Sequence, residues 1–183
     1  MKTLCPPLAF VRTDLLGNTS RLESLAQSLD ESRWSRRASN GGWSPAECVV
    51  HLNTTSEAFV PLIAAALDGA KEFCDCSSRR PRFDLIGWLL LKSMEPPYKM
   101  KMKTTRPFEP PAPGPQSELL PRWNDAQSAL IALLERGDAY PISRIKLTSP
   151  FSARVKYSIF CAFRIIAAHQ RRHLFQAERN ATA

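Results

Sequence analysis

The sequence predicts an all-α protein, an up-down four-helix bundle with one long proline-rich connection. Apolar residues recur at spacings of three and four along four long segments, which is typical of helices that bury one face. Few stretches alternate apolar and polar residues with period two, so we expect no sheet. With 183 residues and 44% hydrophobic residues, the chain can bury one core, and we expect a single domain over residues 1–183.

The first helix is predicted over about residues 12–31. Its apolar positions at helical spacing are Leu15, Leu16, Leu22, Leu25, Ala26 and Leu29. Gly17 and Asn18 interrupt this pattern, so its start is poorly defined by the sequence.

The second helix has the clearest boundaries. Ser44 stands at the N-cap, Pro45 at the first helical position and Glu47 at the third, which together predict a capping box. The apolar pattern then continues to Gly69, and Pro61 inside it predicts a kink.

Three further helices are predicted over about residues 83–95, 117–136 and 152–179. Between the first two of these, residues 96–116 contain seven prolines and a basic KMKMK run. Because nothing in this segment favours a helix, we expect a long ordered loop or a strap that lies over the bundle.

The N-terminal residues, the apolar stretches and the cysteines indicate the cellular compartment of the protein. The N-terminus has no sustained apolar run and is broken by Pro6 and Pro7, unlike a signal peptide. The longest apolar stretches are too short to cross a bilayer, so we expect a cytoplasmic protein without a membrane partner. Five scattered cysteines then indicate free thiols. A Cys74–Cys76 pair can bind metal, but two thiols alone do not make a four-ligand site, so we expect two loop cysteines.

The chain is basic, with a net charge of +8 and a pI near 9.6. Such a surface attracts nucleic acid or a small anionic substrate. The basic residues lie in dispersed clusters and no nucleic-acid motif accompanies them, so a solvated basic surface is the simplest interpretation.

Histidines give the strongest indication of chemistry. His169 and His173 are four residues apart on the last predicted helix, so both imidazoles face the same way, about 40° apart around the axis. His51 lies one turn beyond Glu47 on the second helix. If these two helices pack side by side, three imidazoles converge on one divalent ion and leave a position for water, as in catalytic zinc sites. The alternative is that the histidines are unrelated, satisfied helical side chains. No GxSxG, GxGxxG or P-loop suggests another chemistry.

Two motifs resemble a known family. Residues 42–52, GWSPAECVVHL, resemble the "GWS-x-x-E-x-x-x-HL" opening of the DinB-like metal-binding bundle proteins. Residues 169–176, HQRRHLFQ, resemble the "H-x-x-R-H-L-x-Q" closing helix of the same family. Trp34 before the first motif, and Phe108 and Pro110 in the proline-bearing middle segment, follow the same order. The resemblance covers nearly the whole chain.

The resemblance implies a four-helix bundle of DinB-like type in which His51, His169 and His173 bind nickel, zinc or a similar divalent ion. Characterised relatives include S-transferases and isomerases that use low-molecular-weight thiols such as bacillithiol or mycothiol, and their metal favours the reactive thiolate. The partner would then be a small thiol or an electrophile, or water in a hydrolase-like reaction. Many relatives have no demonstrated activity, so a non-catalytic, stress-associated metal-binding bundle is the alternative. The sequence leaves the oligomeric state open, with a homodimer as one alternative.

The sequence also predicts roles for residues near the three histidines. Gln176 either hydrogen-bonds a cofactor or a metal-bound water, or is a helix-packing amide. Cys48 is expected in the core rather than on the metal, and Glu47 is explained by its capping role. Trp43 should pack at the start of the second helix, and Arg172 should lie at the surface or in an ion pair. Residues 96–116 would cover a cleft between the second and last helices.

Overall fold

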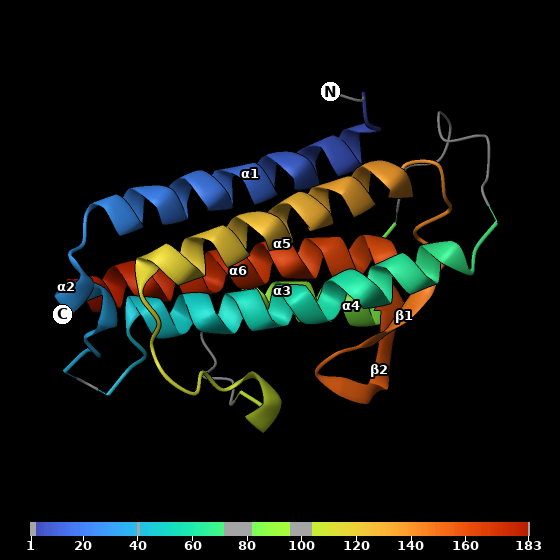
Figure 1. Cartoon of the computed structure of the whole chain (residues 1–183). Coiled ribbons are helices and arrows are strands. Elements are labelled where there is room, and N and C mark those ends of the chain that lie inside the picture. Colours follow the sequence, from blue (N-terminus) through green and yellow to red (C-terminus); the bar gives the residue numbers. More distant parts are fainter. Residues whose placement is uncertain (1–2, 40, 72–81, 96–103, 183) are drawn as a thin grey trace.

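The computed structural model describes residues 3–39, 41–71, 82–95 and 104–182, and helices dominate this part of the chain (Figure 1). The elements in chain order are α1 (Pro6–Gln27), α2 (Glu31–Ser35), α3 (Pro45–Asp68), α4 (Leu85–Met94), the 3-10 helix η1 (Arg106–Phe108), α5 (Gln116–Gly137), β1 (Lys146–Ser149), β2 (Ser152–Ser158) and α6 (Ile159–Ala181). The predicted all-α character is therefore correct for most of the described residues, with one exception at the strands.

The four long helices α1, α3, α5 and α6 pack along one another, but they do not alternate in direction (Figure 1). Arg122 near the start of α5 pairs with Glu57 on α3, and Arg136 near its end pairs with Asp68 at the end of α3, so these two helices are parallel. The predicted up-down order is not observed. A parallel pair needs a connection that returns along the bundle, and the chain between α3 and α5 is long enough for this.

Helix α1 begins at Pro6, earlier than predicted, because Pro6 and Pro7 stand in the first turn, where a missing N–H costs nothing. It passes through Gly17 and Asn18 without a break. The Asn18 side chain is buried and donates to the carbonyl of Ala167 and to Oε1 of Gln170, so α6 satisfies the amide that made this position look like an interruption.

Helix α3 starts as predicted. The Ser44 hydroxyl accepts from the Glu47 N–H at 3.1 Å, and the Glu47 carboxylate accepts from the Ser44 N–H at 2.9 Å. The helix continues through Pro61 and ends before Gly69. This capping box fixes the first turn of α3, and His51 lies one turn further along.

Two corrections concern the last predicted helix and the proline-rich connection. Residues 152–158 form β2, which pairs antiparallel with β1, with Leu147 opposite Tyr157. Val155 and Tyr157 alternate here with the exposed Arg154 and Lys156, a short period-two pattern that is typical of a strand. The predicted absence of a sheet is therefore wrong, and α6 begins only after Ser158, whose hydroxyl caps it. Within the predicted non-helical connection, η1 forms a single 3-10 turn.

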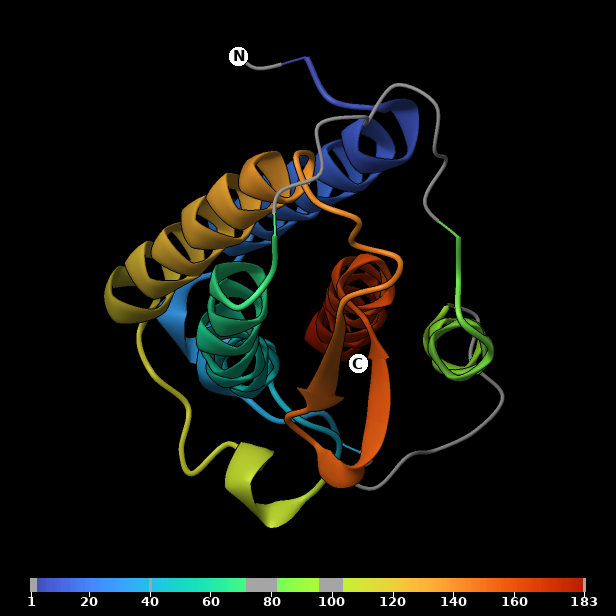
Figure 2. The same cartoon turned by 90° about the vertical axis from the view of Figure 1, so that its right-hand side faces the viewer.

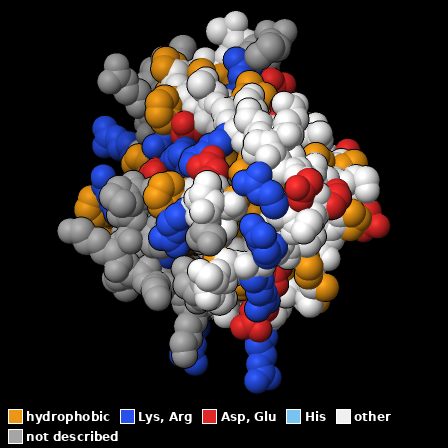
Figure 3. Space-filling view, turned by 90° about the vertical axis from the view of Figure 1, so that its left-hand side faces the viewer, with side chains coloured by type: hydrophobic (Ala, Val, Ile, Leu, Met, Phe, Trp, Pro, Cys, Tyr) orange, Lys and Arg blue, Asp and Glu red, His pale blue; other side chains and the backbone are white. Residues whose placement is uncertain are grey.

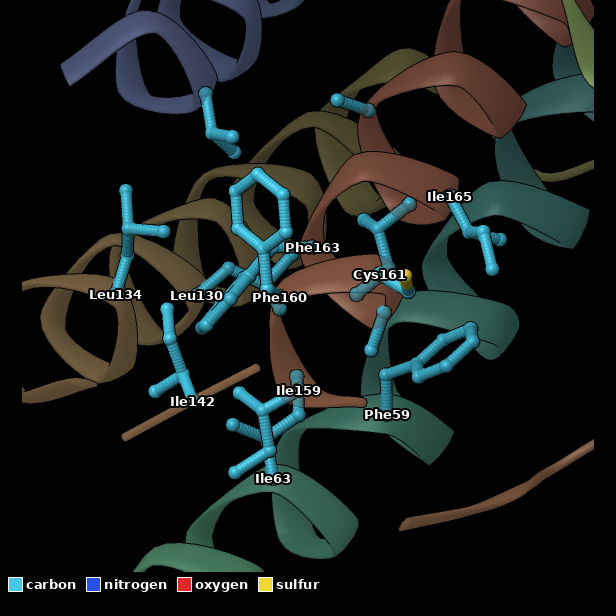
Figure 4. Close-up of a cluster of buried hydrophobic side chains, with 14 of the residues drawn as sticks. Phe59, Ile63, Leu130, Leu134, Ile142, Ile159, Phe160, Cys161, Phe163 and Ile165 are labelled. Atoms are coloured by element: carbon cyan, nitrogen blue, oxygen red, sulfur yellow. The ribbon is translucent and has the colours of Figure 1, made fainter. Parts of the chain in front are cut away.

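A large apolar cluster fills the bundle at the end near the hairpin (Figure 4). Its members come from the four long helices, α4, the hairpin strands and the segment before β1, and include Phe59, Ile63, Leu130, Leu134, Ile142, Phe163 and Ile165. A second cluster around Trp34, Leu52, Trp123 and Leu174 fills the other end. Helices α3 and α6 pass from one cluster to the other, and the three histidines lie near this changeover.

Helix α4 lies beside α6, outside the four long helices (Figure 2). Its prediction over residues 83–95 is confirmed to within two residues. Gly87, Leu91 and Met94 form its buried face. In the described part of the chain, no helix is long and apolar enough to span a membrane.

Candidate metal centre

Three histidines from two helices meet inside the bundle. His51 on α3 and His169 and His173 on α6 place one ligand nitrogen each within 4.8 Å of the other two. The Nε2 atoms of His51 and His169 are 3.1 Å apart, and the three ring centroids are 4.5–5.0 Å apart. The prediction that the second and last helices bring these residues together is therefore confirmed.

All three imidazoles are buried, with 3–8% of each residue exposed. Burial lowers the pKa of His51. Burial also lowers the pKa values of His169 and His173 well below the usual range, and the neighbouring histidines and Arg172 lower them further. The imidazoles are therefore neutral near pH 7, which is the form that binds metal.

The donor set fits one divalent ion. Two nitrogens that bind the same zinc ion at 2.0–2.1 Å each are no more than about 4.2 Å apart. Since the three ligand nitrogens already lie within 4.8 Å of one another, small ring rotations are enough. Imidazole nitrogen is a ligand that zinc, nickel, copper and iron all accept, so the cluster does not select among them.

Hydrogen bonds fix the orientation of two of the three rings. Nδ1 of His51 lies 2.7 Å from the backbone oxygen of Phe108, and Nδ1 of His173 lies 3.1 Å from Oε1 of Gln176. Both oxygens are acceptors, so each Nδ1 carries the proton and each Nε2 has a free lone pair. The Gln176 side chain thus bonds a histidine in this structure, rather than projecting alone toward a ligand.

Aromatic side chains surround the cluster. Trp43 stacks on His173 with centroids 5.8 Å apart and lies 5.1 Å from His51. Phe151, at the turn of the hairpin, lies 5.9 Å from His169 and 4.8 Å from Phe108 on the connection. These rings contribute to the burial of the three imidazoles.

The sequence matches one known protein family over most of its length. The family model of the DinB superfamily matches residues 15–177 of the chain. The protein belongs to the DinB superfamily. The matched range includes both histidine motifs, so the resemblance in the sequence is confirmed over most of the chain. No curated protein matches the chain, and no solved structure matches it either.

In this DinB-superfamily chain, three residues near the histidines in sequence take part in packing, helix capping or hydrogen bonding. Cys48 is fully buried in the second apolar cluster and is not among the residues whose ligand atoms converge. Cys48 is therefore a core residue, as predicted, and its burial raises the pKa of the thiol. Glu47 is occupied by the cap and by Arg37. Arg172 is buried, and its guanidinium donates to the carbonyl of Ser93. The surface position predicted for it is therefore wrong, and the alternative of an ion pair stays a prediction.

Sequence reasoning missed two parts of this DinB-type site. The backbone oxygen of Phe108 carries no sequence signal, because any residue at that position has a carbonyl. The helix predicted over residues 152–179 also gave no indication of Phe151, because it excludes the hairpin whose turn carries this residue. Cys74 and Cys76, predicted to be two loop cysteines, lie outside the described residues.

Proposed function

We propose that this DinB-superfamily protein binds one divalent metal ion through His51, His169 and His173 and uses it to activate a low-molecular-weight thiol, or water. The observation that carries the proposal is the convergence of three buried, neutral imidazoles from two helices. Three protein ligands leave a further position for a small molecule, which is the arrangement of catalytic rather than structural sites.

The chain's own residues have separate tasks in this proposal. The imidazoles hold the ion, and the aromatic walls of Trp43, Phe108 and Phe151 exclude bulk water from it. A divalent ion at this position supplies positive charge that favours the thiolate form of a thiol. Arg172, buried on the same helix and close enough to lower two histidine pKa values, adds positive potential that suits an anionic thiol.

Elemental analysis of protein purified without added metal tests the binding step. We expect about one divalent ion per chain in the wild type and none in His51→Ala. Asn53→Ala is the matched control, because Asn53 is also buried on α3 but donates to the carbonyl of Leu119, away from the histidines. Normal metal content in His51→Ala would refute the site.

A cobalt-substituted sample tests the thiol step. Addition of bacillithiol or mycothiol should change the visible spectrum of the cobalt-loaded wild type, and conjugation of the thiol to an electrophilic dye should depend on the metal. Cobalt-loaded protein that is indifferent to both thiols would contradict the thiol part of the proposal and leave metal binding intact.

The burial of the histidines favours a second candidate function, a non-catalytic metal-binding bundle. With 3–8% of each residue exposed, the imidazoles lie under Trp43, Phe108 and Phe151 rather than at an open mouth. In this alternative the metal raises the melting temperature, while no thiol, electrophile or water-dependent reaction responds to it. The cobalt experiment separates the two functions.

Nucleic-acid binding remains the third hypothesis, based on the net charge of +8. Figure 3 shows Lys and Arg side chains on one end of the molecule together with acidic side chains. Several described arginines have acidic partners: Arg21 pairs with Glu178, Arg37 with Glu47 and Arg122 with Glu57. These pairs reduce the free positive charge. Binding that falls steeply with salt would support the hypothesis.

A further inference from the structure

The ring of His51 is held by a segment from outside the long helices. Its Nδ1 lies 2.7 Å from the Phe108 oxygen, and its Nε2 lies 3.1 Å from Nε2 of His169. A carbonyl oxygen only accepts hydrogen bonds, so it selects the tautomer with the proton on Nδ1. That choice leaves the Nε2 lone pair facing the other histidines, where a metal ligand is needed.

The Phe108 segment reaches this position from the proline-rich connection. Phe108 ends η1, and only 7% of the residue is exposed. Its ring packs against Phe151 of the hairpin turn with centroids 4.8 Å apart, and Phe151 in turn lies 5.9 Å from His169. Two connections that are distant in sequence therefore meet over two of the three histidines.

His173 offers an internal comparison. Its Nδ1 bonds to Oε1 of Gln176, three residues along the same helix. Helix α6 fixes that pair locally, whatever the connection does. The orientation of His51, by contrast, depends on whether residues 104–109 are docked, because its partner lies 57 residues away on a separate segment.

We propose that Phe108 is a positioning residue of the metal centre, and that metal binding and docking of residues 104–109 over His51 are coupled. This inference rests on the proposed metal-binding function. Binding to Nε2 of His51 stabilises the tautomer that donates to the Phe108 oxygen, so the bound state favours the docked segment. By linkage, docking of the segment raises the metal affinity by the same factor by which bound metal raises the docking equilibrium constant.

Zinc affinity, measured by competition with a chromophoric chelator, tests the coupling. Phe108→Ala keeps the backbone oxygen but removes the ring that anchors it on Phe151, and we expect a loss of about tenfold or more in affinity. Phe108→Leu, which keeps an apolar anchor, should recover most of it. Phe10→Ala is the matched control: Phe10 is 55% exposed on α1, and its removal should leave the affinity unchanged.

Amide hydrogen exchange supplies a second readout. Zinc should slow exchange in residues 104–109 of the wild type, and this effect should disappear in His51→Ala. The Gln176→Leu variant should bind zinc more weakly but keep the zinc-dependent protection of residues 104–109 once zinc is saturating, because its partner is His173.

Two results overturn the coupling. One is a Phe108→Ala protein that melts at a lower temperature yet binds zinc within twofold of the wild type, since Phe108 is then only a packing residue. The other is equal exchange in residues 104–109 with and without zinc. A wild type that binds none of zinc, nickel, copper and iron refutes the proposed function and the coupling with it, so the two failures are distinguishable.

Discussion

The carboxylate of Glu47 joins Arg37 to the first turn of the helix that carries His51. It accepts from Nε of Arg37 at 2.9 Å and from the Ser44 N–H at 2.9 Å, and the residue is buried. Burial alone would raise the pKa of this carboxyl, but the hydrogen bonds from Arg37 and Ser44 outweigh it and lower the pKa. The start of α3, and with it the position of His51, therefore depends on an ionised side chain.

Glu47→Ala should lower the free energy of unfolding by about 1–2 kcal/mol, because it removes half of the capping box. Urea denaturation measures the change. Glu57→Ala is the control on the same helix: Glu57 pairs with Arg122 at the surface, and its loss should cost less than about 1 kcal/mol. Equal losses in the two variants would contradict the structural role of the Glu47 cap.

Gly87→Ala should destabilise the packing of α4 on α6. A Cβ added at Gly87 would lie 2.4 Å from Cβ and Sγ of Cys161, so one helix must move. We expect a loss of about 1–3 kcal/mol in urea denaturation, and faster amide exchange in α4. Gly17→Ala is the opposite case, since nothing lies within 4 Å of that position on α1, and it should stabilise by about 0.5–1 kcal/mol. A neutral Gly87→Ala would show that α4 does not pack as described.

Acid should destabilise the metal-free protein. Burial lowers the pKa of all three histidines in the folded state, so below the unfolded value of about 6.5 the unfolded chain binds more protons than the folded chain. Unfolding free energy should then be constant with respect to the histidines above about pH 7 and should fall below about pH 6.5. The fall should continue until the pH reaches the lowered folded pKa values.

The slope of this fall is at most about 1.4 kcal/mol per pH unit for each histidine. Urea denaturation between about pH 5 and 8 measures it, and His51→Ala should show a shallower slope because one buried imidazole is gone. Saturating zinc, which binds the neutral form, should raise the unfolding free energy and extend the fall to lower pH, because metal-bound imidazoles take up no protons. A metal-free wild type whose stability is unchanged between about pH 7 and 5 would rule out depressed histidine pKa values.

Local sequence signals predicted those parts of the molecule that depend on neighbouring residues. Ser44, Pro45 and Glu47 define the start of α3 because a capping box needs only four consecutive residues. His169 and His173 share a face because four residues span about one turn of a helix. The residues of the triad could therefore be named, although their meeting depended on how α3 and α6 pack.

The predictions that were wrong concern residues whose hydrogen-bond or packing partners lie in distant segments. The sequence predicts an interruption of the first helix at Asn18. In the structure the helix continues, because the Asn18 amide donates to Ala167 and Gln170 on α6. Residues 152–158 looked like the start of a helix, but pairing with β1 gives their backbone groups a partner strand. The parallel packing of α3 and α5 depends on contacts between distant segments, and no short sequence pattern predicts it.

The sequence by itself determined the helical character, the capped start of α3 and the identity of the three histidines, because periodicity and capping are local properties of the chain. Only the tertiary structure decided that the imidazoles are buried and neutral, and that the carbonyl of Phe108 orients His51. Burial and long-range hydrogen bonds depend on which segments meet, and the 57 residues between His51 and Phe108 leave no pattern that specifies that contact.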